Sequence, residues 1–212
     1  PVVRSLDFNG TYTNIVHFPV QPWMNTNLIH LTVELWVYPR SVTSTQALVA
    51  RALSTNLWFC LSPNRLRFAR SGGAWVESTQ TVPLRRWSHV AATYDGLTAR
   101  FYINGEPAGQ APLSHAGNTC TNVLSFGGQR DFTTFGDLFA AGYPFNGMLD
   151  EVRLWAAART QAQIAAGMHT ELRFEPWLLA AFGEGGSEEN LSGDIGQCSG
   201  VSPANRLSGF GI

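Results

Sequence analysis

Two glutamates stand inside apolar segments of the sequence, where a carboxylate could take part in chemistry. Glu34 lies within LTVELWVY (31–38), and Glu151 lies within MLDEVRLW (148–155). Two carboxyl groups that face one cavity can hydrolyse a glycosidic bond, one as the acid and the other as the base or nucleophile. Charged groups inside a sheet are normally buried only when they are paired. We therefore expect both glutamates to bind an arginine such as Arg153, or backbone groups, and we predict no catalytic residue.

Histidine, cysteine and serine show no spacing that is typical of catalysis or metal binding. The five histidines include no pair in the H-x-x-x-H arrangement, and neither a G-x-S-x-G motif nor a glycine-rich phosphate loop occurs. Cys60, Cys120 and Cys198 lack the short spacing of a zinc site. They fit either one disulfide with one free thiol or three buried thiols. The sequence thus argues against a nucleophilic or nucleotide-dependent enzyme.

Aromatic side chains are a stronger lead, because seven Trp, five Tyr and thirteen Phe are too many for a core alone. The tryptophans that we expect to be partly exposed are Trp23, Trp58, Trp75 and Trp177. A sugar ring can stack its C–H face on an aromatic plane while nearby polar groups bind its hydroxyls. Exposed tryptophans therefore suggest a glycan ligand, and the alternative is that they only wall the edges of the fold.

Two segments could supply the polar groups of such a site. The stretch RSGGAW (70–75) places Trp75 on the rim of a hairpin, and residues 129–142 form a long segment rich in Asp, Thr, Gly and Phe. We expect the second segment to be a loop, and long loops on a small scaffold are often functional. The predicted ligand-binding residues are Trp75, Arg70, Asp131 and Asp137.

Short strands separated by turn residues must position these groups. Apolar, β-branched and aromatic runs predict strands at residues 31–38, 47–51, 56–61, 65–70, 87–94, 98–103, 123–127 and 148–155. Asp95-Gly96 and Asn104-Gly105 favour tight hairpin turns, and hence a meander of three antiparallel strands. Thr160 with Gln163 matches a capping box, which predicts one short helix near residues 160–169. The pattern is typical of an all-β sandwich or barrel.

Composition sets limits on partners and domain number. The chain has 212 residues, of which 44% are hydrophobic and 14% charged, so it can bury a core and is not disordered. We expect one domain over residues 1–212, because all-β sandwiches of this length are usually single domains. The net charge of −1 argues against nucleic-acid binding, which needs a basic face. No apolar run approaches the roughly 20 residues of a membrane span.

Five sequence blocks follow one another in a defined order. They are SLDFNG (5–10), LTVELWV (31–37), WSHVA with YDG (87–96), FYING (101–105), and FNGMLDEVRLW with RTQ (145–161). In order and spacing these blocks resemble the laminin G-like jelly-roll family, which is similar in fold to concanavalin A-type lectins and pentraxins. The resemblance implies a two-sheet antiparallel jelly-roll sandwich with a last strand within residues 175–182. Residues 183–212 are expected to form an irregular C-terminal strap.

The resemblance also carries expectations for individual residues. Members of this superfamily often bind Ca²⁺ near the first strand and the strand with the Asp-Glu pair, which assigns Asp150, Asp7 and Asn9 as metal ligands. Calcium prefers several oxygen ligands, and the neutral loop NGTYTN (9–14) supplies little of the charge that strengthens binding. The family pattern further places Trp36, Trp87 and Trp155 in the core, and His89 as a hydrogen-bonded core residue.

We therefore predict a non-catalytic recognition module, secreted or displayed at the cell surface. It would bind a glycan or an extracellular protein at a loop rim, with Ca²⁺ as a candidate cofactor. One alternative is a structural or accessory domain of a larger multidomain protein. The other is a glycan-cleaving enzyme, which would need a carboxylate pair about 5–10 Å apart in a cleft.

Overall fold

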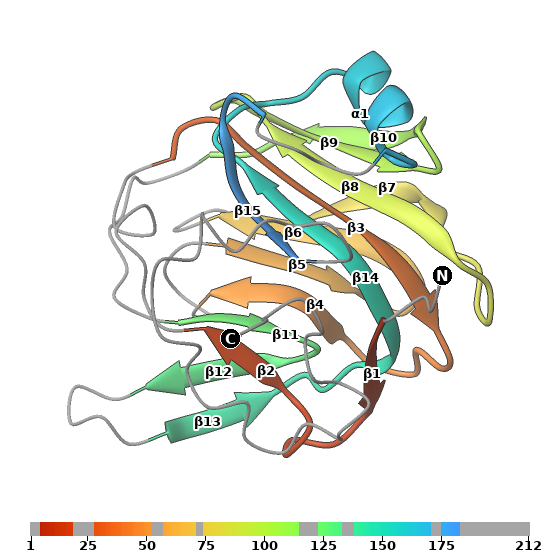
Figure 1. Cartoon of the computed structure of the whole chain (residues 1–212), viewed down its shortest axis with the longest axis vertical. Coiled ribbons are helices and arrows are strands. Elements are labelled where there is room, and N and C mark those ends of the chain that lie inside the picture. The colour runs from red at the N-terminus through yellow and green to blue at the C-terminus, as the bar shows by residue number, and fades with distance from the viewer. Residues whose placement is uncertain are drawn as a thin grey trace.

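The computed structural model of the chain is an antiparallel β-sandwich of two sheets that pack face to face (Figure 1). The structure describes residues 5–18, 28–51, 57–70, 74–114, 123–132, 138–170 and 175–182. The predicted strap at 183–212 lies outside these residues, as do Cys120, Cys198, Trp23 and Asp137. The predicted fold class is confirmed: the protein is all-β with two antiparallel sheets and one short described helix, a sandwich consistent with a jelly roll.

Sheet A has seven strands, and β14 is central because it pairs with three others. The order is β1 (Leu6–Asn9), β14 (Asn146–Trp155), β3 (Leu31–Pro39), β8 (Ser88–Tyr94), β9 (Thr98–Ile103) and β10 (Glu106–Pro112), and β15 (Leu178–Phe182) also pairs with β14. Strands β8, β9 and β10 form the predicted meander. Asn104 at φ 52° and Gly105 at φ 78° make its second turn, as the sequence pattern predicts.

Sheet B has six strands, and a separate pair extends beside it. The order is β2 (Val16–Phe18), β11 (Leu124–Phe126), β4 (Gln46–Arg51), β5 (Leu57–Leu61), β6 (Arg65–Arg70) and β7 (Val76–Thr81). The separate pair is β12 (Gln129–Phe132) with β13 (Leu138–Gly142), so the prediction of a loop over 129–142 is wrong for these strands. Their backbone groups pair although Gly and Ala residues give the sequence no clear strand alternation.

The core lies between the two sheets and consists of the inward side chains of both. Phe59 and Phe68 from sheet B and Leu35 and Phe101 from sheet A all have an exposed fraction of 0%. Removal of apolar surface from water contributes about 25 cal/mol per Å², which makes this layer the main stabilising term. The outward side chains of each sheet are therefore the ones left to form binding surfaces.

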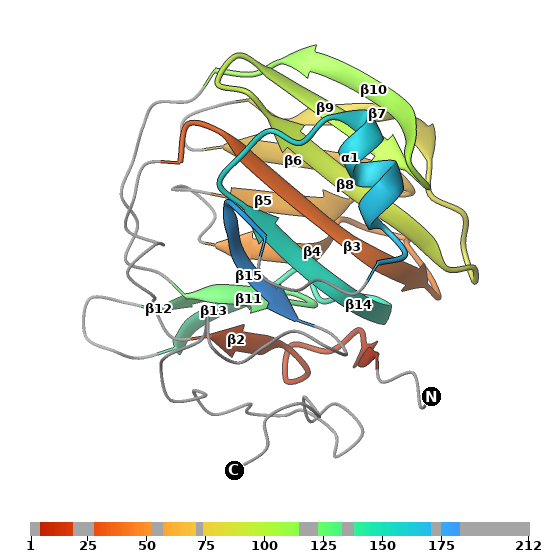
Figure 2. The same cartoon turned by 45° about the horizontal axis from the view of Figure 1, so that its top comes forward.

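One helix, α1 (Gln161–Gly167), lies on the outer face of sheet A over β8 and β9 (Figure 2). The predicted capping box is confirmed, because the Thr160 hydroxyl accepts from the Gln163 N–H and the Gln163 side chain accepts from the Thr160 N–H at 2.8 Å. Ile164 is buried against Ala91 and Tyr102 of the sheet below. Within the described part of the chain, no helix is long and apolar enough to cross a membrane.

The turn after β11 brings backbone against an aromatic ring of the core. Gly127 has φ +71°, and a Cβ atom there would lie 2.0 Å from Cδ1 of Phe8, whose side chain is fully buried. We expect Gly127→Ala to lower the free energy of unfolding by about 2–5 kcal/mol, because it combines a left-handed backbone with overpacking. Urea unfolding measures this change.

The control is Gly10→Ala, also at positive φ (+78°), where the nearest contact of the new Cβ would be 3.2 Å from Asn146. It should cost only the backbone term of about 1–2 kcal/mol. Equal losses for the two variants would contradict the close packing of Phe8 on Gly127.

The His89 side chain is buried without the hydrogen bonds that the family resemblance implied for it. Its side chain points to the outer face of sheet A, packs edge-on against Trp36 with ring centroids 5.5 Å apart, and has an exposed fraction of 1%. Neither ring nitrogen has a hydrogen-bond partner among the described residues. Burial lowers the pKa of His89 to about 3, and the nearby charges of Arg153 and Arg159 lower it further in the same direction. The ring is therefore neutral in the folded protein.

This burial predicts a loss of stability in mild acid. Between pH 6.5 and pH 3 the unfolded chain protonates His89 and the folded chain does not, so the free energy of unfolding falls as the pH falls through this window. From pH 7 to pH 5 the contribution of His89 should be about 2 kcal/mol. Urea unfolding at both pH values should show a smaller drop for His89→Gln than for the wild type. An identical drop in both proteins would contradict the neutral, buried ring.

Candidate functional site

Three aromatic rings meet on the outer face of sheet B, and we call Trp58, Trp75 and Tyr143 the aromatic cluster. Trp58 is the middle ring, with its centroid 4.3 Å from Trp75 and 4.7 Å from Tyr143. Trp58 is 5% exposed, whereas Trp75 and Tyr143 are each 38% exposed. The prediction of partial exposure is therefore confirmed for Trp75 and wrong for Trp58. The cluster therefore presents two partly exposed rings that pack against a buried one.

Small residues on the neighbouring strands make room for the Trp58 indole. In the strand register Trp58 stands opposite Ala50 of β4 and Ala69 of β6, and Ala47 stands opposite Cys60. These side chains form a small apolar cluster separate from the main core. Burial raises the pKa of the Cys60 thiol, and this thiol is free, so Cys60 acts here as a small apolar residue.

Backbone contacts fix the ring at each end of the cluster. The carbonyl of Tyr143, a residue at φ 55°, accepts a hydrogen bond of 2.9 Å from the Ala47 N–H, which ties the segment after β13 to β4. Trp75 directly precedes β7, whose first residue, Val76, pairs with Phe68. Each exposed ring is thus held by an element adjacent to the strand that carries Trp58.

A charged pair borders the cluster on the side of Trp75. The guanidinium carbon of Arg67 lies 5.6 Å from the Trp75 ring centroid, and Arg67 Nε donates to Glu77 Oε1 at 2.7 Å. Both side chains are about one-third exposed. The Trp58 indole N–H has no acceptor among the described residues, and such a buried donor costs roughly 1–3 kcal/mol. Partly exposed aromatic rings beside groups that donate and accept hydrogen bonds suit a ligand that is both ring-shaped and hydroxylated.

Of the four predicted ligand-binding residues, the structure places Trp75 on this surface and Arg70 away from it. Arg70 is 3% exposed and lies on the inner side of β6, where Nη2 donates to the Leu28 carbonyl at 2.6 Å and the guanidinium faces the Tyr94 ring. Burial lowers the pKa of Arg70 to about 10. Strand alternation after Arg67 sends Arg70 inward, so it cannot share a surface with Trp75.

The other two predicted residues lie on the β12–β13 segment. Asp131 stands in β12 opposite Ala140 of β13. Asp137 lies outside the described residues. Sequence reasoning missed Tyr143, Arg67 and Glu77. Strand register pairs Arg67 with Glu77 beside Trp75, and the hydrogen bond from Ala47 to the Tyr143 carbonyl places Tyr143 beside Trp58.

The residues predicted to bind calcium lie along the pairing of β1 with β14. Asp7 stands opposite Met148, and Asn9 stands opposite Asn146, so Asn9 is the farther of the two from Asp150. Both Asp7 oxygens accept from Arg40, at 2.6 and 2.8 Å, and the Asn9 side chain accepts from Thr11. Among the described residues no three His, Cys, Asp or Glu side chains are grouped to hold a metal. Calcium binding at Asp150, Asp7 and Asn9 therefore stays a prediction.

The two glutamates that opened the possibility of catalysis are engaged by arginines, as predicted. Glu34 is fully buried and accepts from the Arg159 guanidinium and from the Trp155 indole at 2.9 Å, with Arg153 at 4.0 Å. Burial raises the pKa of Glu34, and the two arginines and the indole act in the opposite direction. Glu151 binds Arg153 at 2.9 Å. Both carboxylates therefore serve the structure in these contacts.

Comparison with known proteins agrees with this architecture. Residues 9–165 match the Laminin_G_3 family, described as the concanavalin A-like lectin/glucanases superfamily, and the chain belongs to this family. Pappalysin-1 of Mus musculus is 32% identical over 91 residues, which are 40% of this chain and 5% of that protein. The chain thus spans a small fraction of the length of this curated relative.

Solved structures with the same fold include proteins of different kinds. A candidate carbohydrate-binding protein from Bacteroides ovatus has a TM-score of 0.63 and 21% identity, covering 86% of this chain and 52% of that one. The heptameric SAP-like pentraxin of Limulus polyphemus has a TM-score of 0.55 and 18% identity, covering 76% and 79%. Domain 4 of the extracellular arabinanase AbnA from Geobacillus stearothermophilus, solved with arabinotriose, has a TM-score of 0.52 and 22% identity, covering 76% and 75%. At these identities the likeness shows the fold.

The structural role of Glu34 predicts that its removal destabilises the protein more than removal of the exposed carboxylate of Asp7. We expect Glu34→Ala to lower the free energy of unfolding by about 3–5 kcal/mol, because it leaves two arginines without their buried partner. The matched control is Asp7→Ala, which breaks a pair whose side chains are 36% and 47% exposed and should cost about 1 kcal/mol or less. Urea unfolding distinguishes the two. Similar losses would contradict the assignment of Glu34 as a structural anchor.

Proposed function

We propose that this domain is a non-catalytic recognition module that binds glycan on the aromatic cluster of sheet B. The observation that carries the proposal is the pair of exposed rings, Trp75 and Tyr143, that flank Trp58 beside the Arg67–Glu77 pair. Such rings can receive the C–H face of a sugar, while the charged pair offers donors and acceptors to its hydroxyls. The bound arabinotriose of the AbnA domain and the description of the Bacteroides ovatus protein support a glycan as the ligand class.

The proposal also states that the domain binds glycan without cleaving it and that it is secreted or located at the cell surface. The superfamily includes glucanases, so membership by itself does not separate binding from hydrolysis. The positions of Glu34 and Glu151 favour binding, because Glu34 has no exposed surface from which to reach a glycosidic bond and Glu151 is paired with Arg153. A secreted or cell-surface location is supported by the similarity to a domain of an extracellular arabinanase.

A second candidate function is an accessory domain of a larger protein. It is favoured by the short share, 5%, of mouse Pappalysin-1 that the chain matches. In that case the surface of sheet B would contact a protein rather than a glycan. A glycan array that stays blank would favour this second function over the first.

The first experiment is a glycan array probed with the labelled protein, followed by titration of the strongest ligand into Trp75→Ala. We expect a loss of affinity of tenfold or more, equivalent to about 1.4 kcal/mol, because the variant removes a stacking face. Trp177→Ala is the matched control, since Trp177 is 70% exposed and is not part of the aromatic cluster. An unchanged affinity in Trp75→Ala, or an equal loss in the control, would contradict the assignment of the site.

The same array also tests the predicted calcium. Binding that is lost with a chelator and restored by added Ca²⁺ would support a calcium-dependent lectin, with Asp150, Asp7 and Asn9 as the first candidates for substitution. Binding that survives the chelator would mean that the aromatic cluster recognises glycan without the metal.

A further inference from the structure

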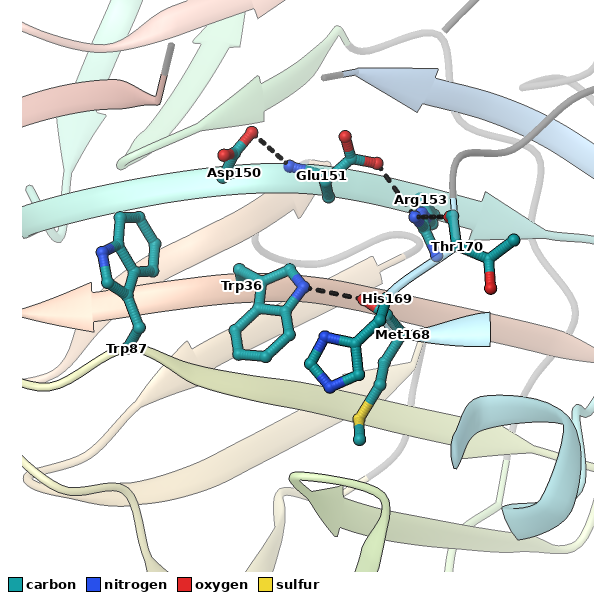
Figure 3. Close-up of a pocket in the computed structure, with 8 residues that line it drawn as sticks. All are labelled: Trp36, Trp87, Asp150, Glu151, Arg153, Met168, His169 and Thr170. Atoms are coloured by element: carbon teal, nitrogen blue, oxygen red, sulfur yellow. Dashed lines mark hydrogen bonds and ion pairs between the residues drawn. The ribbon is translucent and has the colours of Figure 1, made fainter. Parts of the chain in front are cut away.

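A second hollow lies on the outer face of sheet A, on the opposite side of the sandwich from the aromatic cluster. Its volume is about 400 Å³, within the range of roughly 300–1,000 Å³ that is usual for small-molecule sites. The lining residues come from three strand regions and from the segment after α1, as Figure 3 shows. They are Trp36, Trp87, Asp150, Glu151, Arg153, Met168, His169 and Thr170.

Two tryptophans that the sequence assigned to the core form walls of this pocket. Trp36 and Trp87 are half-buried and project from the outer face of sheet A (Figure 3), so their predicted placement in the core is wrong. Trp155 is 4% exposed and is buried as predicted. The Trp36 indole donates to the Met168 carbonyl at 2.9 Å, and the His169 ring lies 5.2 Å from Trp36. One wall is thereby fixed in position before any ligand arrives.

A bulge in β14 brings two consecutive carboxylates to this face. Asp150 pairs with Trp36 and Arg153 pairs with Glu34, so β14 has one more residue than β3 over this interval. The irregularity includes Glu151 at φ 50°, a backbone conformation that costs a non-glycine residue stability. In a regular strand Glu151 would face the opposite side from Asp150. Bulges that re-aim side chains occur next to functional sites, and strained residues cluster there.

Arg153 lines the pocket but its guanidinium is already engaged. Nη2 donates to Glu151 and to the Thr170 carbonyl, and Nη1 donates to the Gly167 carbonyl. These bonds hold the segment after α1 over the sheet and neutralise the Glu151 charge. The pocket therefore offers indole faces, carboxylate oxygens and the exposed polar side chains of His169 and Thr170, rather than a cluster of available cations.

We propose that this pocket is a second glycan site, which takes one neutral sugar residue and makes the domain bivalent. The sugar ring stacks between the indoles of Trp36 and Trp87, and its hydroxyls donate to carboxylate oxygens at the bulge. The Arg153 guanidinium is engaged by Glu151 and by two backbone carbonyls and is not available to an anionic sugar, which favours a neutral one. Because the two sites lie on opposite faces of the sandwich, one domain can bind two glycan chains at once. The inference concerns different residues from the proposed function, so either site can fail without the other.

The experiment titrates arabinotriose and the neutral trisaccharides of glucose and xylose into the isotopically labelled protein and follows the indole N–H signals by NMR. The titration extends to a sugar concentration about tenfold above a millimolar dissociation constant. Two separate sets of shifts are expected in the wild type. Trp87→Ala should abolish the set that includes Trp36, and Trp75→Ala should abolish the set that includes Trp58.

A more conservative variant tests the pocket in case Trp87→Ala fails to fold. Glu151→Gln keeps an oxygen for Arg153 and should weaken only the sheet A site, by about tenfold. Trp177→Ala is the control that should change neither site. Bivalency is read from the clustering of glycan-coated beads, which the wild type should cause and either tryptophan variant should prevent while still binding.

The outcomes separate the two proposals. Shifts at Trp58 alone, unchanged by Trp87→Ala and Glu151→Gln, would overturn the second site and leave the first. Shifts at Trp36 alone that survive in Trp75→Ala would support the pocket and overturn the aromatic cluster. The absence of any shift with the whole panel would overturn the pocket as a site for neutral sugars.

Discussion

The buried carboxylate of Glu34 imposes the constraint on which much of sheet A depends. A charge with no exposed surface must be paired, and Glu34 recruits Arg159 from the connection before α1 and Arg153 from β14. Arg153 in turn donates to the carbonyls of Gly167 and Thr170. Through these contacts the buried Glu34 charge connects β3 and β14 to the segment around α1. The pocket beside Trp36 exists because that segment is held against the sheet.

Both candidate binding surfaces follow from the same alternation of side chains. In each sheet the inward positions supply the core, and outward aromatic residues such as Trp36, Trp87 and Trp75 stay partly exposed. On sheet B, alanines beside Trp58 make room for its indole, which packs against Trp75. On sheet A, the bulge at Glu151 breaks the alternation and adds a carboxylate to the surface. The two faces consequently differ in chemistry although they belong to one scaffold.

Signals from neighbouring residues were sufficient to predict most of the strands, the turns and the helix. Tight turns such as Asn104-Gly105 and the capping box at Thr160 appear in the structure because their geometry depends on neighbouring residues alone. The predictions that failed depend on distant contacts. Arg70 lies inside because of its register in β6, and His89 lacks hydrogen bonds because Trp36 and its surroundings cover it. Neither environment can be read from adjacent residues.

The sequence by itself determined the fold class, the meander, the short helix, the arginine pairing of its two embedded glutamates and the exposure of Trp75. These features follow from side-chain periodicity, turn chemistry and the cost of an unpaired buried charge. Only the tertiary structure decided which residues share a surface. It joined Tyr143 to Trp58, separated Arg70 from Trp75, and turned Trp36 and Trp87 into pocket walls. The physical reason is that strand register and a single-residue bulge fix which face a side chain takes, and both are set by pairing between distant segments.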